Sequence, residues 1–363
     1  MIRTQGAQDR QGTPGASPPR RFSWIYGAPV DLFVALCWIP IFAWAHRLSA
    51  GHGTGNDHLL NLLFNGAFLL SLLHQPLTLA LVYGDRNQFA LRRRLFTWSP
   101  VVAVALITVA VSLNLWIIIP VAAIWNTIHT LQQRYGLSRI YARKAGYGSA
   151  RLDRAVLYTW MVAAIVVVGA AGTTLRQLSR VMLGGANEQA VVDLTKVRPY
   201  ALWLLVPAVL VAFAAAAALA RQEARHLQEA NRAKWIYQAS SLGLIASIAV
   251  DPLAGFIAYV AAHAIEYFVV VDKTMESRYQ RAPRPDRPAL LARLAARPAS
   301  RWAFLLAFLG FFFLLDARTS EALPGQSYLI ILYSIGILHF WYDSFIWKLR
   351  KPAVAASFGI SRA

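Results

Sequence analysis

The sequence has few charged residues, few acidic residues in particular, and a single cysteine. Charged residues make up 15% of its 363 residues, whereas an average soluble domain contains about a quarter. One cysteine, Cys37, can form neither an internal disulfide nor a cysteine-rich zinc or iron–sulfur site, so we expect a small buried apolar side chain there. The composition therefore excludes an ordinary soluble domain and a disulfide-stabilised scaffold.

Hydrophobic residues make up 57% of the chain and occur in long runs such as Val101–Pro120 and Tyr200–Ala220. A helix needs about 20 apolar residues to cross the hydrocarbon core of a bilayer, and the runs are close to this length. The sequence predicts an all-α, polytopic integral membrane protein, a helix bundle with about ten transmembrane helices. The expected spans are residues 30–46, 59–83, 96–113, 114–134, 155–172, 199–220, 235–250, 253–271, 302–316 and 327–347.

The basic residues determine the orientation of these spans. Lys and Arg number 36 against 17 Asp and Glu, which gives a net charge of +19. If both termini are cytoplasmic, thirty of the 36 basic residues lie in cytoplasmic segments and six in external loops. Cytoplasmic loops of membrane proteins carry this kind of excess. The charge therefore predicts a multi-pass protein of the cell (inner) membrane, N-in and C-in, with no nucleic-acid partner.

Composition also divides the chain into three parts. Residues 1–28 are rich in Gly, Pro, Gln and Arg, which predicts a disordered basic cytoplasmic tail. Residues 29–350 form the transmembrane helical domain, and residues 351–363 form a short cytoplasmic C-terminal tail. Within the domain, tight turns are expected at Ser112–Asn114 and at Asp251–Pro252, where proline disfavours continuation of a helix.

Four of the eight histidines fall inside the expected spans, on helices that all run from outside to inside: His74, His129, His263 and His339. Three of them precede the first cytoplasmic charge by 9 to 11 residues, which places their rings in one layer roughly 14–17 Å from the inner helix ends. His129 precedes Arg134 by only 5 residues. It is therefore expected nearer the cytoplasm, unless its helix continues through Tyr135.

Each of these histidines has a polar residue three or four positions later, on the same helix face. These neighbours are Thr78 after His74, Gln132 and Gln133 after His129, Glu266 and Tyr267 after His263, and Asp343 after His339. Ionisable side chains within a bilayer are costly and mark functional sites. We therefore expect the four histidines to bind a metal, Glu266, Asp343 and Tyr267 to be catalytic, and Thr78, Gln132 and Gln133 to hydrogen-bond to the ligands.

Neutral imidazoles with one or two carboxylates suit Fe(II), and also Zn or Cu. The leading hypothesis is an intramembrane non-haem iron oxidoreductase of the oxygenase, hydroxylase or desaturase type. It would act on an apolar lipid or isoprenoid substrate near the cytoplasmic leaflet, with a cytoplasmic electron donor. By architecture alone, the four histidines resemble the four-histidine iron sites of carotenoid-cleaving enzymes. The spaced histidine boxes of membrane desaturases and hydroxylases do not occur in the sequence.

Two other functions remain open. Paired histidines at one depth could be the axial ligands of a b-type haem in a redox protein. Alternatively, the histidines, Glu266 and Asp343 could form the proton relay of a proton-coupled transporter. In all three cases the surrounding membrane lipids are the immediate partners.

The predicted topology can be tested with reporter fusions at both termini and in the 173–198 loop. We expect cytoplasmic reporters to be active at the two termini and a periplasmic reporter to be active in the loop, because the basic residues follow that alternation. An external C-terminus would contradict both the number of helices and the depth assigned to the histidines.

Overall fold

The computed structural model is helical over the residues it describes, which are 22–51, 54–113, 118–171, 196–280, 290–295, 297–323, 325–348 and, near the C-terminus, 354, 355, 358 and 360. Its helices are α1 (Ala28–Leu36), α2 (Trp38–Ala50), α3 (Thr54–Tyr83), α4 (Arg86–Ala90), α5 (Arg93–Ser112), α6 (Ile118–Ala145), α7 (Ala150–Ala170), α10 (Arg198–Arg225), α11 (Arg232–Val250), α12 (Pro252–Gln280), α13 (Leu290–Leu294), α14 (Pro298–Ala322) and α15 (Gly325–Ile346). No strand occurs in this described part of the chain. Residues 1–21 of the expected disordered tail, and most of residues 351–363, lie outside it.

Eight helical segments are long and apolar enough to cross a membrane, which indicates an integral, multi-pass membrane protein. The segment over residues 28–50 combines α1 and α2, which meet at the buried Cys37. The other two expected spans, 114–134 and 235–250, correspond to α6 and α11, which are helical but are not among the eight. The expected turns are confirmed where described: α5 ends at Ser112, and Asp251 separates α11 from α12.

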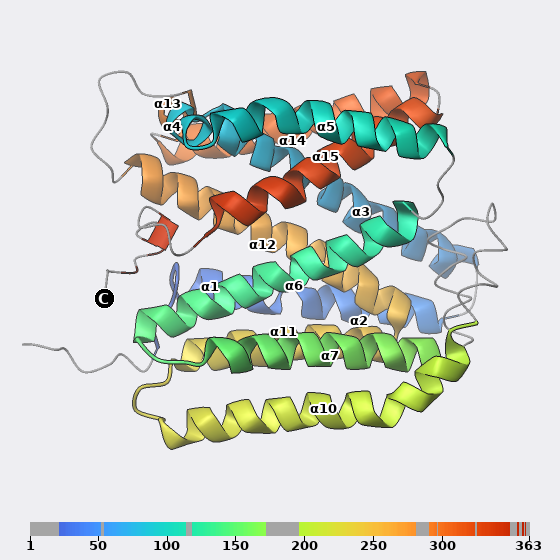
Figure 1. Cartoon of the computed structure of the whole chain (residues 1–363), viewed down its shortest axis with the longest axis vertical. Helices are drawn as coiled ribbons and strands as arrows, with labels where there is room; N and C mark the ends of the chain where they lie inside the picture. Colours follow the sequence, from blue (N-terminus) through green and yellow to red (C-terminus); the bar gives the residue numbers. More distant parts are fainter. Residues whose placement is uncertain are drawn as a thin grey trace, which may run out of the picture.

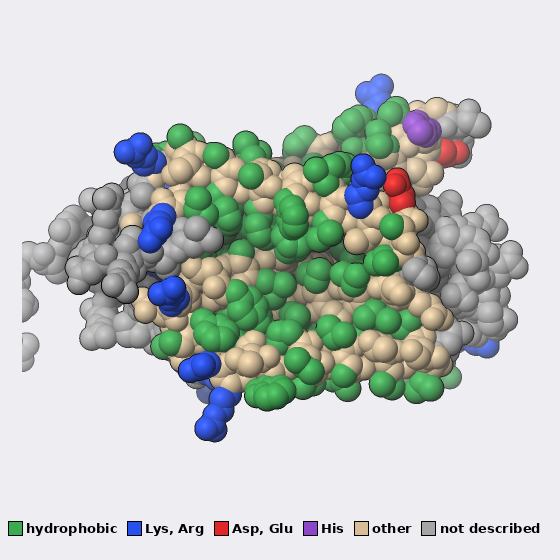
Figure 2. All heavy atoms as spheres, turned by 90° about the horizontal axis from the view of Figure 1, so that it is seen from above, with side chains coloured by type: hydrophobic (Ala, Val, Ile, Leu, Met, Phe, Trp, Pro, Cys, Tyr) green, Lys and Arg blue, Asp and Glu red, His purple; other side chains and the backbone are tan. Residues whose placement is uncertain are grey.

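The long helices lie side by side along one direction, and α12 crosses the middle of the bundle (Figure 1). The four histidine-bearing helices, α3, α6, α12 and α15, run toward the same end of the bundle, as predicted (Figure 1). Figure 2 shows a broad hydrophobic band along the side of the molecule, with Lys and Arg gathered mainly at that end. The distribution of polar and apolar side chains is that of a protein lying across a bilayer.

Helix α12 is the most buried of the candidate spans, with 78% of its apolar window inside the protein. Ala254, Ala258 and Ala262 recur every fourth residue on one face, and each has no exposed surface. Small side chains let neighbouring backbones approach closely in membrane proteins. Helices α2, α3 and α11 therefore pack against α12 and surround the polar side chains that it carries.

Helix α6 is longer than the sequence predicts, because it continues past Arg134 to Ala145. It ends in a tight turn in which Gly146 and Gly148 adopt φ angles of 70° and 128°. Glycine adopts this left-handed backbone without steric cost. Ser149 then caps α7 by accepting a hydrogen bond from the Leu152 amide.

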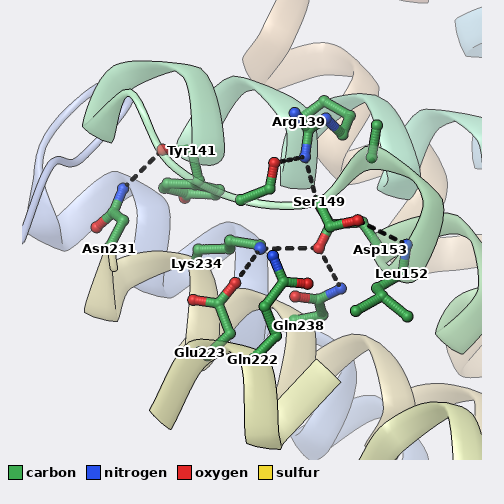
Figure 3. Close-up of polar contacts among 12 residues, drawn as sticks. Arg139, Tyr141, Ser149, Leu152, Asp153, Gln222, Glu223, Asn231, Lys234 and Gln238 are labelled. Carbon is green, nitrogen blue, oxygen red and sulfur yellow. Dashed lines mark hydrogen bonds and ion pairs between the residues drawn. The ribbon is translucent and has the colours of Figure 1, made fainter. Parts of the chain in front are cut away.

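Four charged side chains, three of them buried, lie beneath this turn and connect α6, α7, α10 and α11 (Figure 3). The Lys234 ammonium lies 2.8 Å from Asp153 and 2.7 Å from Glu223. Asp153 also pairs with Arg139, and Glu223 accepts a hydrogen bond from the Trp235 indole. Each charge is compensated, so the four helices are held in register by a neutral network.

Removal of the Lys234 charge should destabilise the protein. We expect Lys234→Met to lower the free energy of unfolding by about 3–5 kcal/mol, because Glu223 loses its buried ionic partner. The measurement is thermal unfolding in detergent. The double variant Lys234→Met/Glu223→Gln, which restores neutrality, should unfold at a higher temperature than the single one. The exposed Arg225→Ala on α10 is the matched control and should leave the melting temperature unchanged.

Candidate metal centre

The four intramembrane histidines meet in one buried cluster. The Nε2 atom of His339 lies 3.2 Å from that of His74 and 3.1 Å from that of His129. The ring centroid of His263 lies 4.8 Å from that of His74 and 5.2 Å from that of His129. The rings of His74, His263 and His339 are fully buried and that of His129 nearly so.

The spacing of the nitrogens fits ligands that share one ion. At a metal–nitrogen bond of about 2.0–2.1 Å, nitrogens of adjacent ligands lie roughly 2.9–3.4 Å apart in octahedral or tetrahedral geometry. A neutral imidazole has one donor and one acceptor nitrogen. If Nε2 of His339 is the acceptor nitrogen, its single lone pair can accept a hydrogen bond from only one of its two close neighbours. A cation bound to Nε2 of His339 would occupy its lone pair and could take a second nitrogen at this distance as a further ligand.

Thr78, Tyr267 and Asp343 form a hydrogen-bonded group beside His339. Thr78 donates its hydroxyl proton to Asp343 Oδ1 at 2.9 Å, and its oxygen lies 2.7 Å from Nδ1 of His339. Since Thr78 has one proton to donate, its oxygen accepts the Nδ1 proton of the ring. This leaves the lone pair of His339 on Nε2, the atom that faces the other histidines. Tyr267 also donates to Asp343 Oδ1, at 3.1 Å, and contacts the Thr78 hydroxyl.

Asp343 adds a carboxylate to the imidazoles. Its Oδ2 atom lies 3.7 Å from Nε2 of His129 and 3.9 Å from Nε2 of His339. The cluster comprises two overlapping sets of close ligand atoms, one from His74, His263 and His339 and the other from His129, His339 and Asp343. His339 belongs to both sets and links them. Within the described chain, neither ring nitrogen of His263 has a hydrogen-bond partner.

Of the two depths expected for His129, the structure shows the one in which its helix continues through Tyr135. Arg134 does not mark the inner end of the helix, because α6 continues for about three further turns to Ala145. Arg134 is fully buried, donates to Ser241 at 3.1 Å, and lies 3.7 Å from Glu266. Arg134 therefore belongs to the protein interior. The ring of His129, one turn before it, lies at the depth of that of His339.

Glu266 faces away from the histidine cluster. Its carboxylate accepts hydrogen bonds from Gln133 at 2.7 Å and from the Tyr237 hydroxyl at 2.8 Å, besides its ion pair with Arg134. Gln133 accordingly contacts Glu266 and the His263 carbonyl rather than an imidazole. The structure therefore groups Asp343, Tyr267 and Thr78 with the histidines, and places Glu266 and Gln133 in a neighbouring polar cluster.

A cavity of about 210 Å³ adjoins the cluster between α6, α12 and α15. His129, Asp343 and Tyr267 line its inner end, and Gln132, expected beside His129, lines it as an exposed side chain. Its further lining residues are Gln133, Leu137, Ile140, Val270, Phe340, Ser344, Trp347, Lys348 and Phe358. The sequence indicated neither this cavity nor the roles of Arg134 and Tyr237. The recurrence of Leu137, Ile140 and Tyr141 at helical spacing beyond Arg134 was the one signal that the helix continues past that residue.

The position of Glu266 leads to a test of its role. Glu266→Gln should destabilise the protein, since it leaves the Arg134 guanidinium buried without a carboxylate. The double variant Glu266→Gln/Arg134→Met should recover much of the loss, with a coupling energy of about 0.5–3 kcal/mol in a double-mutant cycle of thermal unfolding. Additive effects of the two changes would contradict the ion pair.

Comparison of the chain with protein-family models, with curated proteins and with solved structures found no match. No relative therefore supplies a function for the histidine cluster. The geometry of the cluster and of the cavity beside it is what points to a function.

Proposed function

We propose that the protein is an intramembrane metalloenzyme, a non-haem iron oxidoreductase that acts on a lipid-like substrate. The observation that carries the proposal is the approach of the Nε2 atoms of His74 and His129 to within 3.1–3.2 Å of that of His339, with the Asp343 carboxylate beside them. His74, His129, His263 and His339 would bind the ion. Asp343 would complete the ligand set or accept a proton, and Tyr267 and Thr78 would hold it in place.

The choice of ion follows from the ligands. Imidazole nitrogens and a carboxylate suit Fe(II), Zn and Cu, whereas Mg and Ca prefer oxygen ligands alone. Zinc is not redox-active, whereas iron and copper can both use O₂, and a carboxylate beside histidines is typical of non-haem Fe(II) oxygenases. The close packing also favours a single ion over a b-type haem, because nitrogens about 3 Å apart leave no space for a macrocycle between the rings.

The proposed reaction requires O₂ and two electrons from a cytoplasmic donor. In a hydroxylation, R–H + O₂ + 2 e⁻ + 2 H⁺ gives R–OH + H₂O: a C–H bond is replaced by C–O, and the second oxygen atom is reduced to water. The ion would supply the chemistry of O₂ reduction. The chain itself would contribute the buried site that excludes bulk water, and the carboxylate of Asp343 to receive or deliver a proton.

We further propose that ten segments cross the membrane, namely the eight apolar ones together with α6 and α11. Both termini would then be cytoplasmic, and the protein would belong to the cell (inner) membrane. The gathering of basic side chains at the end toward which the four histidine helices run supports this orientation (Figure 2).

The metal content of the purified protein tests the proposal. We expect about one transition-metal ion per chain, measured by elemental analysis after gentle purification in detergent. His263→Ala and His339→Ala should each reduce the content at least about tenfold, because each removes a ligand from a site that needs all of its donors.

The matched controls are the exposed histidines outside the cluster. His46→Ala, which loses a pair with Asp251, and His226→Ala should keep the metal content of the wild type. Size-exclusion profiles would establish that the cluster variants are folded. A folded wild-type protein that holds no transition metal would overturn the enzyme proposal and favour the proton relay.

A further inference from the structure

We propose that the cavity beside the histidine cluster binds an amphiphile with one apolar chain and an anionic head, and that Lys348 recognises the head. This inference rests on the proposed function and narrows its substrate from lipids in general to acidic amphiphiles. The chain would extend inward past Phe340 to the histidines. The head, a carboxylate or a phosphate, would remain at the end of α15.

The lining of the cavity fits a hydrocarbon chain. Leu137 and Ile140 of α6, Val270 of α12, and Phe340 and Trp347 of α15 line it together with Phe358 of the C-terminal segment. These apolar side chains come from three helices and a separate segment, so a chain in the cavity would be enclosed on several sides. Contact with apolar side chains stabilises a bound chain by roughly 0.8 kcal/mol for each buried methylene group.

The side chains at the two ends of the cavity determine which way the amphiphile lies. The inner end is lined by the buried side chains of Asp343 and Tyr267, where an anionic head would lose its hydration. Lys348 lines the cavity nine positions beyond His339 in the chain, which corresponds to about 13 Å along a helix. A head bound at Lys348 therefore places a carbon some way down the chain, rather than the first carbon, beside the histidines.

The position of the opening is also consistent with a substrate that arrives from the membrane. Gln132 of α6 and Ser344 of α15 line the cavity and are both exposed. They belong to α6 and α15, so the cavity reaches the protein surface between these two helices. An amphiphile could enter sideways from the lipid while its head stays at the polar surface, next to Lys348.

Fluorescence quenching would test the inference directly. The probes are dodecanoic acid, dodecyl phosphate and dodecanol, each with a bromine on its terminal carbon, added to protein in zwitterionic lipid nanodiscs. Bromine quenches tryptophan on contact, and Trp347 lines the cavity. We expect the two anionic probes to quench wild-type fluorescence at concentrations about tenfold lower than the alcohol, because a charged head gains a hydrogen bond to an ammonium group. The stronger of the two distinguishes a carboxylate from a phosphate head.

Three variants assign the signal. Trp347→Phe should remove the saturable part of the quenching, and Lys348→Gln should abolish the preference for anionic heads while the alcohol binds as before. Arg94→Gln changes an exposed basic residue on α5 and should retain the preference. Quenching that is unchanged in Trp347→Phe, or equal affinities for acid, phosphate and alcohol in the wild type, would overturn the inference.

The metal content of the same preparations separates this inference from the proposed function. Protein stripped of metal by a chelator should keep its preference for the anionic probes, because Lys348 and the apolar lining remain. If the protein holds metal but the probes cause no quenching that depends on Trp347, the amphiphile inference is refuted and the enzyme proposal is unaffected. Quenching with the anionic preference but without metal supports the amphiphile and refutes the enzyme proposal.

Discussion

Polar groups buried in this protein have no water to bind, so each must find a partner on another helix, and the packing of the helices depends on this constraint. Helix α12 carries His263, Glu266 and Tyr267 through the most buried part of the bundle, where an unsatisfied polar group costs several kcal/mol. Glu266 and Tyr267 are successive residues of the helix and point about 100° apart, so their side chains face different partners. Tyr267 joins Asp343 of α15 on one side, and Glu266 joins Arg134 of α6 on another. These two helices therefore meet α12 through polar contacts.

Basic residues in this chain have two roles that look alike in the sequence. Most of them flank the spans, and their distribution predicts the orientation. Three of those assigned to cytoplasmic segments, Arg134, Lys234 and Arg301, are instead buried beside carboxylates inside the protein. The two depths that the sequence left open for His129 follow from this ambiguity. A basic residue marks a membrane boundary only when no acidic residue on another helix can reach it, and the sequence does not say which helices are neighbours.

The sequence was sufficient to predict the helices and the meeting of the histidines, but not the partners of each side chain. Apolar length gave the helices, and the common direction of four of them brought His74, His129, His263 and His339 together. A spacing of three or four residues restricts two side chains to one face, yet that face is wide. Rotation of α12 about its axis, set by its packing on α2, α3 and α11, decides that Tyr267 reaches the cluster and Glu266 does not.

The charges of the buried core favour a cation among the histidines. Glu266 is compensated by Arg134, and the Lys234 network is neutral in itself. Among the described residues, the ion-pair partners of the buried Asp343 are two histidines, His129 and His339, and no Lys or Arg. Hydrogen bonds from Thr78 and Tyr267 compensate part of the cost of burying its charge, but an isolated carboxylate in an apolar interior remains expensive. A divalent ion held by neutral imidazoles would balance that carboxylate and satisfy the lone pairs that face it.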